Sequence, residues 1–306
     1  MHGMPPTKTR TATMHEVVNH AEELRQFALA KHRGGELEEA LAAYDEALAA
    51  TSDEEQRELI TINKADVLIE LQRGGPEVNA LPTILMRRRN PHHTFLAAYQ
   101  LQFKHRTAGE KDRAAFYGQI ARAAAAETGN TFWQIAALNE LGILFEADSQ
   151  FDKAIECFEE SLAHLDSLNA PDEHRIGRTA TVQNLAYNKL LVGRTEEALQ
   201  LLHGVLEDIE NPSSRADAYV DLCYGYLEIE EFEKAIGCGK SGLELAVEPR
   251  QTRNAHYLLG EAYYKSGDIE TAEYHFEELA RYYPQFRNLK SLLFAIDLRS
   301  MLNLNL

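Results

Sequence analysis

The sequence predicts an all-α protein in which pairs of helices stack into a right-handed superhelix. One short pattern, a turn followed by a helix with an alanine and an aromatic residue four positions later, occurs in residues 35–48, 149–162 and 267–284. In five places, a small residue stands twelve positions before the alanine of such a helix. A single helix pair cannot bury its apolar face, so the pairs must stack on one another. We therefore expect about seven helix pairs and a C-terminal capping helix.

Each predicted pair has the residues that two closely packed helices need. The small residue of the first helix marks the place where the helices cross, and the alanine of the second helix lets its partner approach. The aromatic or apolar residue that follows fills the remaining gap. A short turn with glycine or serine links the two helices. The matching positions are Ala28 and Ala40, Gly142 and Ala154, Ala186 and Ala198, Cys223 and Ala235, and Gly260 and Ala272.

The last of these pairs resembles the tetratricopeptide repeat (TPR). Residues 259–284 reproduce the spacing L-G-x2-Y … A-x3-F … P of that 34-residue unit, and His256 stands in the place of its tryptophan. The resemblance implies a single TPR solenoid over residues 15–306, after a disordered tail over 1–14 and with a terminal helix over 287–303. Clear repeats are expected at 21–54, 135–168, 179–212, 216–249 and 253–286, and degenerate repeats at 58–90 and 92–129.

The composition predicts a soluble, cytoplasmic protein. The 306 residues contain no apolar stretch long enough for a membrane span, and the first residues lack the apolar core of a signal peptide. The three cysteines form no C-x-x-C motif, which suits a reducing compartment. Residues 138–285 hold 29 acidic and 12 basic residues and so account for the net charge of −17. An acidic chain repels phosphate, so nucleic acid is not an expected partner.

Two stretches come close to catalytic or metal-binding motifs but have the wrong spacing. The histidines of HEVVNH (15–20) are five residues apart and lie on different faces of a helix, so they cannot form the zinc-binding pair of HExxH. The GCGKSG stretch (237–242) lacks the first glycine of a P-loop, because Lys234 stands there. No Ser-His-Asp pattern is apparent either. We expect no enzymatic activity, no cofactor and no metal site.

The TPR resemblance also implies where a partner would lie. In TPR proteins, the first helix of each pair lines the concave face of the superhelix. This geometry, transferred residue by residue, marks a lining of acids, amides and tyrosines that suits a peptide backbone and a partner with basic character. The expected partner-binding residues are Asn139, Glu140, Glu146, Gln183, Asn184, Tyr187, Asp217, Asp221, Tyr224, Glu228, Asn254, Tyr257, Glu261 and Tyr264.

Two functions agree with this pattern. The first is a non-catalytic scaffold or adaptor that holds a peptide segment or a partner protein in the groove. The alternative is a cytosolic peptide sensor, because the helix-pair spacing and the asparagines resemble the TPR part of peptide-pheromone receptors. The first repeat begins near residue 21, so we expect no DNA-binding head and a sensor that acts through a protein partner. A clamp for C-terminal carboxylates is disfavoured, because Arg25 and Leu29 replace its lysine and asparagine.

The C-terminal segment suggests a second copy of the chain as a further partner. Its apolar residues fall on one broad helical stripe, which is wider than a cap on the last repeat requires. A homodimer through this helix is therefore an alternative to a simple cap. The stripe consists of Leu289, Leu292, Leu293, Phe294, Ile296, Leu298, Met301 and Leu302.

Overall fold

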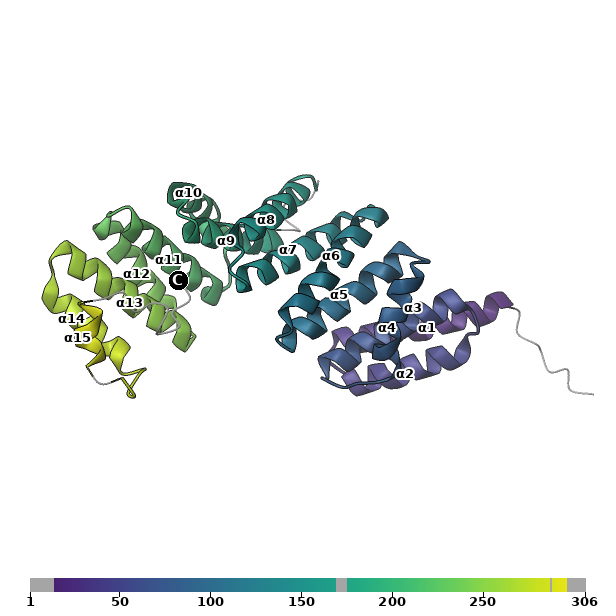
Figure 1. Ribbon diagram of the computed structural model, residues 1–306. Coiled ribbons are helices and arrows are strands. Elements are labelled where there is room, and N and C mark those ends of the chain that lie inside the picture. The colour runs from purple at the N-terminus through teal and green to yellow at the C-terminus, as the bar shows by residue number, and fades with distance from the viewer. Residues whose placement is uncertain (1–13, 169–174, 287, 296–306) are drawn as a thin grey trace, which may run out of the picture. The chain divides into compact units, whose positions relative to one another are not determined.

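The computed structural model describes residues 14–168, 175–286 and 288–295, and within these ranges it contains helices and connecting turns but no β-strand (Figure 1). In the described part of the chain, fourteen α-helices form seven consecutive pairs, and a short fifteenth helix follows them. The predicted all-α fold of stacked helix pairs is confirmed. No helix in the described ranges is long and apolar enough to cross a membrane.

The pairs divide between two compact units, unit 1 (Met1–Ala137) and unit 2 (Leu138–Leu306), with the boundary inside α7. The helices of unit 1 are α1 (Met14–Arg33), α2 (Leu37–Ala50), α3 (Glu54–Glu70), α4 (Pro76–Arg87), α5 (Pro91–Thr107) and α6 (Lys111–Thr128). After α7 (Thr131–Ala147), unit 2 contains α8 (Phe151–Asp166), α9 (Arg175–Leu191), α10 (Thr195–Val205), α11 (Pro212–Glu228), α12 (Phe232–Leu245), α13 (Pro249–Ser266), α14 (Ile269–Ala280) and α15 (Leu289–Leu293). A single 3-10 turn, η1 (Leu206–Asp208), extends α10.

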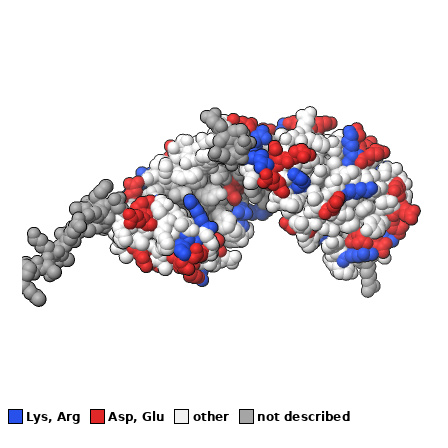
Figure 2. Space-filling model, turned by 180° about the vertical axis from the view of Figure 1, so that it is seen from behind, with Lys and Arg blue, Asp and Glu red and all other residues white. Residues whose placement is uncertain are grey.

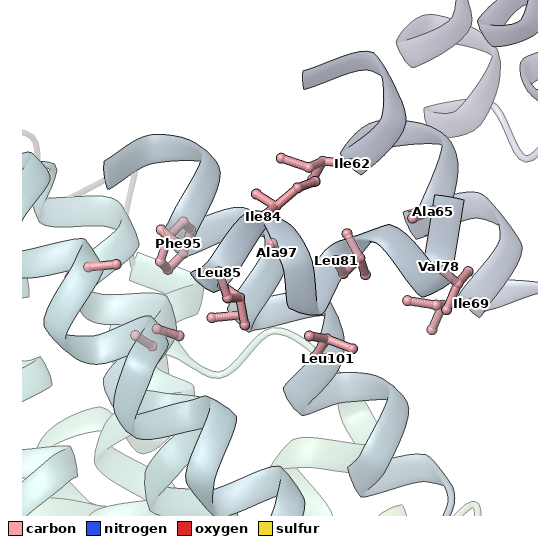
Figure 3. Close-up of a cluster of buried hydrophobic side chains, with 14 of the residues drawn as sticks. Ile62, Ala65, Ile69, Val78, Leu81, Ile84, Leu85, Phe95, Ala97 and Leu101 are labelled. Atoms are coloured by element: carbon pink, nitrogen blue, oxygen red, sulfur yellow. The ribbon is translucent and has the colours of Figure 1, made fainter. Parts of the chain in front are cut away.

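The core of unit 1 is built from aliphatic side chains and alanines. Ile62 of α3, Leu81 and Leu85 of α4, and Phe95 of α5 belong to one buried cluster (Figure 3). The ring of Phe95 stacks on Trp133, with the ring centroids 4.6 Å apart. Each large side chain in such a cluster contributes about 1.5–3 kcal/mol through its removal from water. The weakly patterned middle of unit 1 therefore has a buried apolar core.

The first helix of each of the seven pairs ends in the same backbone conformation. Each turn contains one residue with positive φ, which in six of the pairs stands five positions before the alanine at the crossing of the second helix. The α3–α4 turn is longer, because Gly74 and Gly75 precede α4. The N–H that follows the residue with positive φ donates a hydrogen bond to the carbonyl five positions earlier, over 2.7–3.0 Å. This bond satisfies a carbonyl at the helix end and reverses the chain, as in a Schellman motif. The left-handed residues are Gly35, Gln72, Gly109, Ser149, Gly193, Glu230 and Gly267.

The crossings of the α7–α8 and α13–α14 pairs are filled by complementary side-chain volumes. A Cβ atom on Gly142 would lie 2.7 Å from Cζ of Phe158, and a Cβ atom on Gly260 would lie 2.3 Å from Cε1 of Phe276. Both rings are fully buried. The glycines therefore leave the space that the rings of the second helices occupy.

In two pairs, the large and small residues have exchanged helices. Cys223 of α11 stands at the small position, and the aromatic position of α12 holds Gly239. A Cβ atom on Gly239 would lie 2.8 Å from Cδ2 of Leu259 on α13 and 3.1 Å from Sγ of Cys223. The α5–α6 pair goes further, with the buried Gln102 in the first helix and the buried Gly118 in the second. This exchange is why residues 92–129 match the repeat pattern only weakly, although their helices and turn are regular.

The two ends of the predicted solenoid are described only in part. The predicted tail over 1–14 lies outside the described residues except for Met14, at which α1 begins. Of the predicted terminal helix over 287–303, residue 287 and residues 296–303 also lie outside them. The described part forms α15, and its Leu289 and Leu293 are buried in the core of unit 2.

Candidate functional site

The first helices of four successive pairs line a groove in unit 2. The groove has a volume of about 750 Å³. Its walls come from the end of α7, from α9, from α11 and from the start of α13, with Ser149 and Phe151 beside the first of these. Because stacked pairs repeat the same orientation, side chains from equivalent positions of these helices gather along one surface.

The structure brings most of the predicted binding residues together in two places. The residues that line the 750 Å³ groove are Glu146, Gln183, Asn184, Tyr187, Asp217, Asp221 and Asn254. A second cavity of about 300 Å³, also in unit 2, is lined by Tyr224, Glu228, Tyr257, Glu261 and Tyr264. The two remaining residues, Asn139 and Glu140, line neither cavity. The amide of Asn139 donates to the hydroxyl of Thr181 over 3.0 Å and so links α7 to α9.

The groove also contains a cation that the repeat register does not include. A guanidinium nitrogen of Arg250 lies 2.9 Å from Oδ1 of Asp217 and 3.1 Å from Oδ2. The predicted repeat begins at residue 253, but α13 begins earlier, at Pro249, and so adds Arg250 to the wall. Proline is favoured at the first position of a helix, and this was the sequence signal for the earlier start.

Two carboxyl groups of the groove lie in surroundings that disfavour their charge. Burial, followed by the nearby charges of Asp217 and Glu146, raises the pKa of Asp221 well above its usual value, against the opposing effect of Arg250. Burial also raises the pKa of Glu146, although a hydrogen bond of 2.6 Å from the amide of Asn188 partly offsets it. The ion pair of Arg250 with Asp217 leaves these two carboxyl groups without a salt bridge in the described residues.

Tyr187 lies close enough to Asp221 and Glu146 for their negative charges to act on its phenol. Burial raises the pKa of Tyr187, and the negative charges of Asp221 and Glu146 add to this effect. The phenol therefore keeps its proton at neutral pH. Tyr187 can offer a hydrogen-bond donor and an aromatic face to a ligand.

The amides of α9 divide between structural bonds and the groove. The amide of Gln183 donates to the carbonyl of Ser214 over 2.8 Å, which ties α9 to α11. The Asn188 amide donates to Glu146 and to the carbonyl of Asn184. The side-chain amide of Asn184 itself lines the groove and makes no hydrogen bond within the described ranges. An asparagine in this situation can pair with both an N–H and a C=O of an added peptide.

The second cavity is closed on one side by the chain's own C-terminal segment. Leu293, Phe294 and Ala295 form part of its wall. The ring of Phe294 packs edge-on against Tyr264 and Phe276, with centroids 5.3 and 4.9 Å apart. Tyr264 of this cavity therefore already contacts an apolar segment.

Arg25, which stands where a carboxylate clamp would have its lysine, contacts other residues of unit 1. Its guanidinium pairs with Glu22 at 2.6 Å and donates to the side-chain oxygen of Asn63 at 3.0 Å. Over the residues that the structure describes, no three His, Cys, Asp or Glu side chains are grouped closely enough to hold a metal ion.

On the face of unit 2 at the right of Figure 2, acidic side chains cover more of the surface than basic ones.

Comparisons with known proteins identify the repeat directly. The family model of the tetratricopeptide repeat matches residues 253–286. No curated protein is similar to the chain in sequence. Among solved structures, the apo form of RapI is 14% identical with a TM-score of 0.67, and the match covers 93% of this chain and 84% of RapI.

Two further structures show the same fold at low identity. One is a signal-transduction ATPase with numerous domains and a tetratricopeptide repeat sensor, PH0952 from Pyrococcus horikoshii. It is 16% identical, with a TM-score of 0.70 over 92% of this chain and 45% of that protein. The other is BtubC from P. vanneervenii, 15% identical, with a TM-score of 0.55 over 77% of this chain and 93% of BtubC. With the matched repeat and the seven helix pairs, these likenesses establish that the chain is a protein of the tetratricopeptide-repeat fold.

Proposed function

We propose that the chain is a non-catalytic interaction protein that holds a peptide segment of a partner in the groove of unit 2. The observation that carries this proposal is the meeting of Glu146, Tyr187 and Asp221 with the available amide of Asn184 along one groove. The groove supplies hydrogen bonds, an aromatic surface and charge, which are the means of binding.

The partner segment is proposed to be extended. The groove follows four successive first helices, so a ligand along it passes one helix after another. The side-chain amide of Asn184 can pair with the backbone of such a segment. Tyr187 offers a large contact area with few rotatable bonds.

The partner segment is also proposed to have basic character. Asp221 and Glu146 are held in surroundings that penalise their charge, and a cationic group between them would relieve that penalty. The excess of acids over residues 138–285 would draw a basic segment towards unit 2.

The three free cysteines agree with a proposed cytoplasmic setting.

A sensor is the second candidate. The observation in its favour is that PH0952, which carries a tetratricopeptide repeat sensor, aligns with 92% of this chain. A sensor would use the same groove and pass the signal to a protein partner. The scaffold remains our main proposal because the likeness, at 16% identity, concerns the fold.

Pools of synthetic peptides test this proposal without a known partner. Two fluorescent pools would share randomised positions and differ at one fixed residue, which is arginine in one pool and glutamate in the other. We expect the arginine pool to raise fluorescence anisotropy on titration with the protein and the glutamate pool to do so much less. Binding should weaken as salt is added, because partly exposed charges are screened.

The double variant Asp221→Asn with Glu146→Gln is the matching test on the protein. It removes both charges, while the glutamine oxygen can still accept the bond from Asn188. We expect binding of the arginine pool to fall by about tenfold or more, as for the loss of a partly buried charge contact. The control, Glu156→Gln on the outer helix α8, removes an exposed charge and should leave binding unchanged. Equal binding of both pools, or equal affinity of the double variant, would refute the proposal.

A further inference from the structure

Two histidines contact each other in the core of the last repeat. His256 of α13 and His275 of α14 are only 7% and 6% exposed, and their Nδ1 atoms lie 3.0 Å apart. The ring of His275 also stacks on Tyr263, with centroids 5.6 Å apart and planes within 10° of parallel. His256 occupies the place of the repeat's tryptophan, so a polar bond replaces apolar packing between α13 and α14.

The bond between the two imidazoles requires a proton on one Nδ1 and none on the other, so two neutral rings that form it are of opposite tautomers. One ring must carry its proton on Nδ1 and donate it, while the other must leave Nδ1 free to accept it. A first added proton can keep this bond but places a charge in the core. A second proton turns the accepting Nδ1 into an N–H, so that two donors and two positive charges face each other at 3.0 Å.

The charged groups around the pair make protonation still harder. Burial lowers the pKa of His275 to about 4, helped by the charges of His256 and of Lys240 on α12. Burial also lowers the pKa of His256, and Glu278 on α14 opposes this effect only in part. The other neighbours are the phenols of Tyr263 and Tyr274, whose rings contact His275.

We propose that the His256–His275 contact is an acid-sensitive latch that holds α13 against α14 at neutral pH and releases the last repeat when both rings take up protons. The same helix α13 carries Asn254, Tyr257 and Glu261 towards the two cavities of unit 2. Release would therefore remove one wall of the proposed binding site. This regulatory consequence rests on the proposed function, but the latch does not.

The sign of the effect follows from the direction of the two shifts. A histidine whose pKa is lower in the folded state stabilises that state fully only above its unfolded pKa, which is about 6.5. The contribution is lost as the pH falls through the window between about 6.5 and the folded pKa. Within this window, each histidine raises the unfolding constant of the repeat by about tenfold for every unit by which the pH falls.

Hydrogen exchange of the ligand-free full chain tests the latch. Protection of α13 and α14 would be compared with that of α9 and α10 from about pH 7 to about pH 5, after correction for the intrinsic exchange rate. We expect α13 and α14 to lose at least tenfold more protection than α9 and α10. The variant His275→Gln, which cannot take up a proton there, should flatten this difference. The control His164→Gln on α8, in the same unit, should preserve it.

A measurement on the unmodified protein covers the case in which His275→Gln does not fold. Nitrogen-15 spectra of the imidazoles report the tautomer and the titration of each ring. Of the 12 histidines, we expect His256 and His275 to stay neutral as the pH is lowered from about 7 to about 5 and to be of opposite tautomers. Their titration midpoints should lie below those of the other histidines. Three results would overturn the latch. Protection could fall equally in both helix pairs, or its dependence on pH could be unchanged in His275→Gln. The third is that no imidazole titrates with a lowered midpoint. Because no ligand is present, these results are independent of whether the groove binds a peptide.

Discussion

At a helix crossing, glycine is required where an aromatic ring of the second helix occupies the space of a Cβ atom. The Phe276 ring occupies the space where Gly260 would carry a Cβ atom, and Phe158 does the same at Gly142. In α11 and α12 the larger residue is Cys223 and the partner is Gly239. The volume at the crossing is thus shared between two positions sixteen residues apart. Neither position can change size alone without strain.

Gly260→Ala should destabilise the protein. The added methyl group would lie 2.3 Å from the Phe276 ring, which is fully buried and has little room to move. We expect a loss of about 1–3 kcal/mol in the free energy of unfolding, from urea denaturation. Gly237→Ala is the matched control, because this helical glycine has no atom within 4 Å of a built Cβ. It should be neutral or stabilise by up to about 1 kcal/mol through helix propensity. Equal urea midpoints for the two variants would contradict the crossing model.

Asp221→Asn should stabilise the ligand-free protein at neutral pH. The folded pKa of Asp221 lies above its unfolded value, so its contribution is favourable at low pH and is lost as the pH rises through the folded pKa. Asparagine removes the charge and keeps the shape. The urea midpoint should therefore rise near pH 7 and change little near pH 4. The exposed Glu156→Gln should show no such dependence, and a lower midpoint for Asp221→Asn near pH 7 would show that the carboxylate is stabilised instead.

The helix pairs are defined by their turns as much as by their crossings. All seven turns use one left-handed residue and one hydrogen bond to the carbonyl five positions earlier. Glycine takes this conformation without strain and fills four of the turns, whereas Gln72, Ser149 and Glu230 adopt it with a side chain present. In those three turns, the left-handed backbone of a residue with a side chain costs free energy, and the packing of the helix pair compensates for it.

Glu230→Gly should stabilise the α11–α12 pair. Glu230 has a φ of +61°, a conformation that costs an ordinary residue about 1–2 kcal/mol relative to glycine. Part of that gain is lost to the greater entropy of glycine in the unfolded chain, so we expect a net rise of about 0.5–1 kcal/mol in urea denaturation. The reciprocal change Gly193→Ala, at a φ of +79°, should destabilise by a similar amount. If both variants shifted the midpoint in the same direction, left-handed strain would not be the cause.

The sequence allowed five pairs to be predicted because the spacing between Gly142 and Ala154 recurs, and this spacing reflects a fixed crossing geometry. The α5–α6 pair was harder to recognise, because Gln102 and Gly118 fill its crossing in the reverse order. Arg250 was missed in the groove because the repeat pattern does not contain the first turn of α13. The contact of His256 with His275 could not be foreseen, because it joins positions nineteen residues apart on two helices.

At the scale of the whole molecule, the net charge lies in the C-terminal part of the sequence, and three exposed apolar or aromatic side chains lie near its end. Residues 138–285 account for the entire net charge of −17. Tyr282, Phe286 and Leu292 are 42%, 37% and 39% exposed near the end of unit 2. Apolar side chains that remain accessible at the end of a solenoid are candidates for contact with another protein. Leu293, by contrast, is buried in the chain's own core and takes no part in such a contact.

We predict that the full chain forms a homodimer through this end, and light scattering at several concentrations measures it. The mass should rise towards twice 34.5 kDa with concentration. The double variant Phe286→Glu with Leu292→Glu should remain a monomer, because two carboxylates would have to be buried against the second copy. Ile176→Glu is the control, since this residue of α9 is 73% exposed but lies in another repeat. Repulsion between two acidic chains opposes the contact, so added salt should favour the dimer. A mass of one chain at every concentration and salt level would leave α15 as a cap that stabilises only its own repeat.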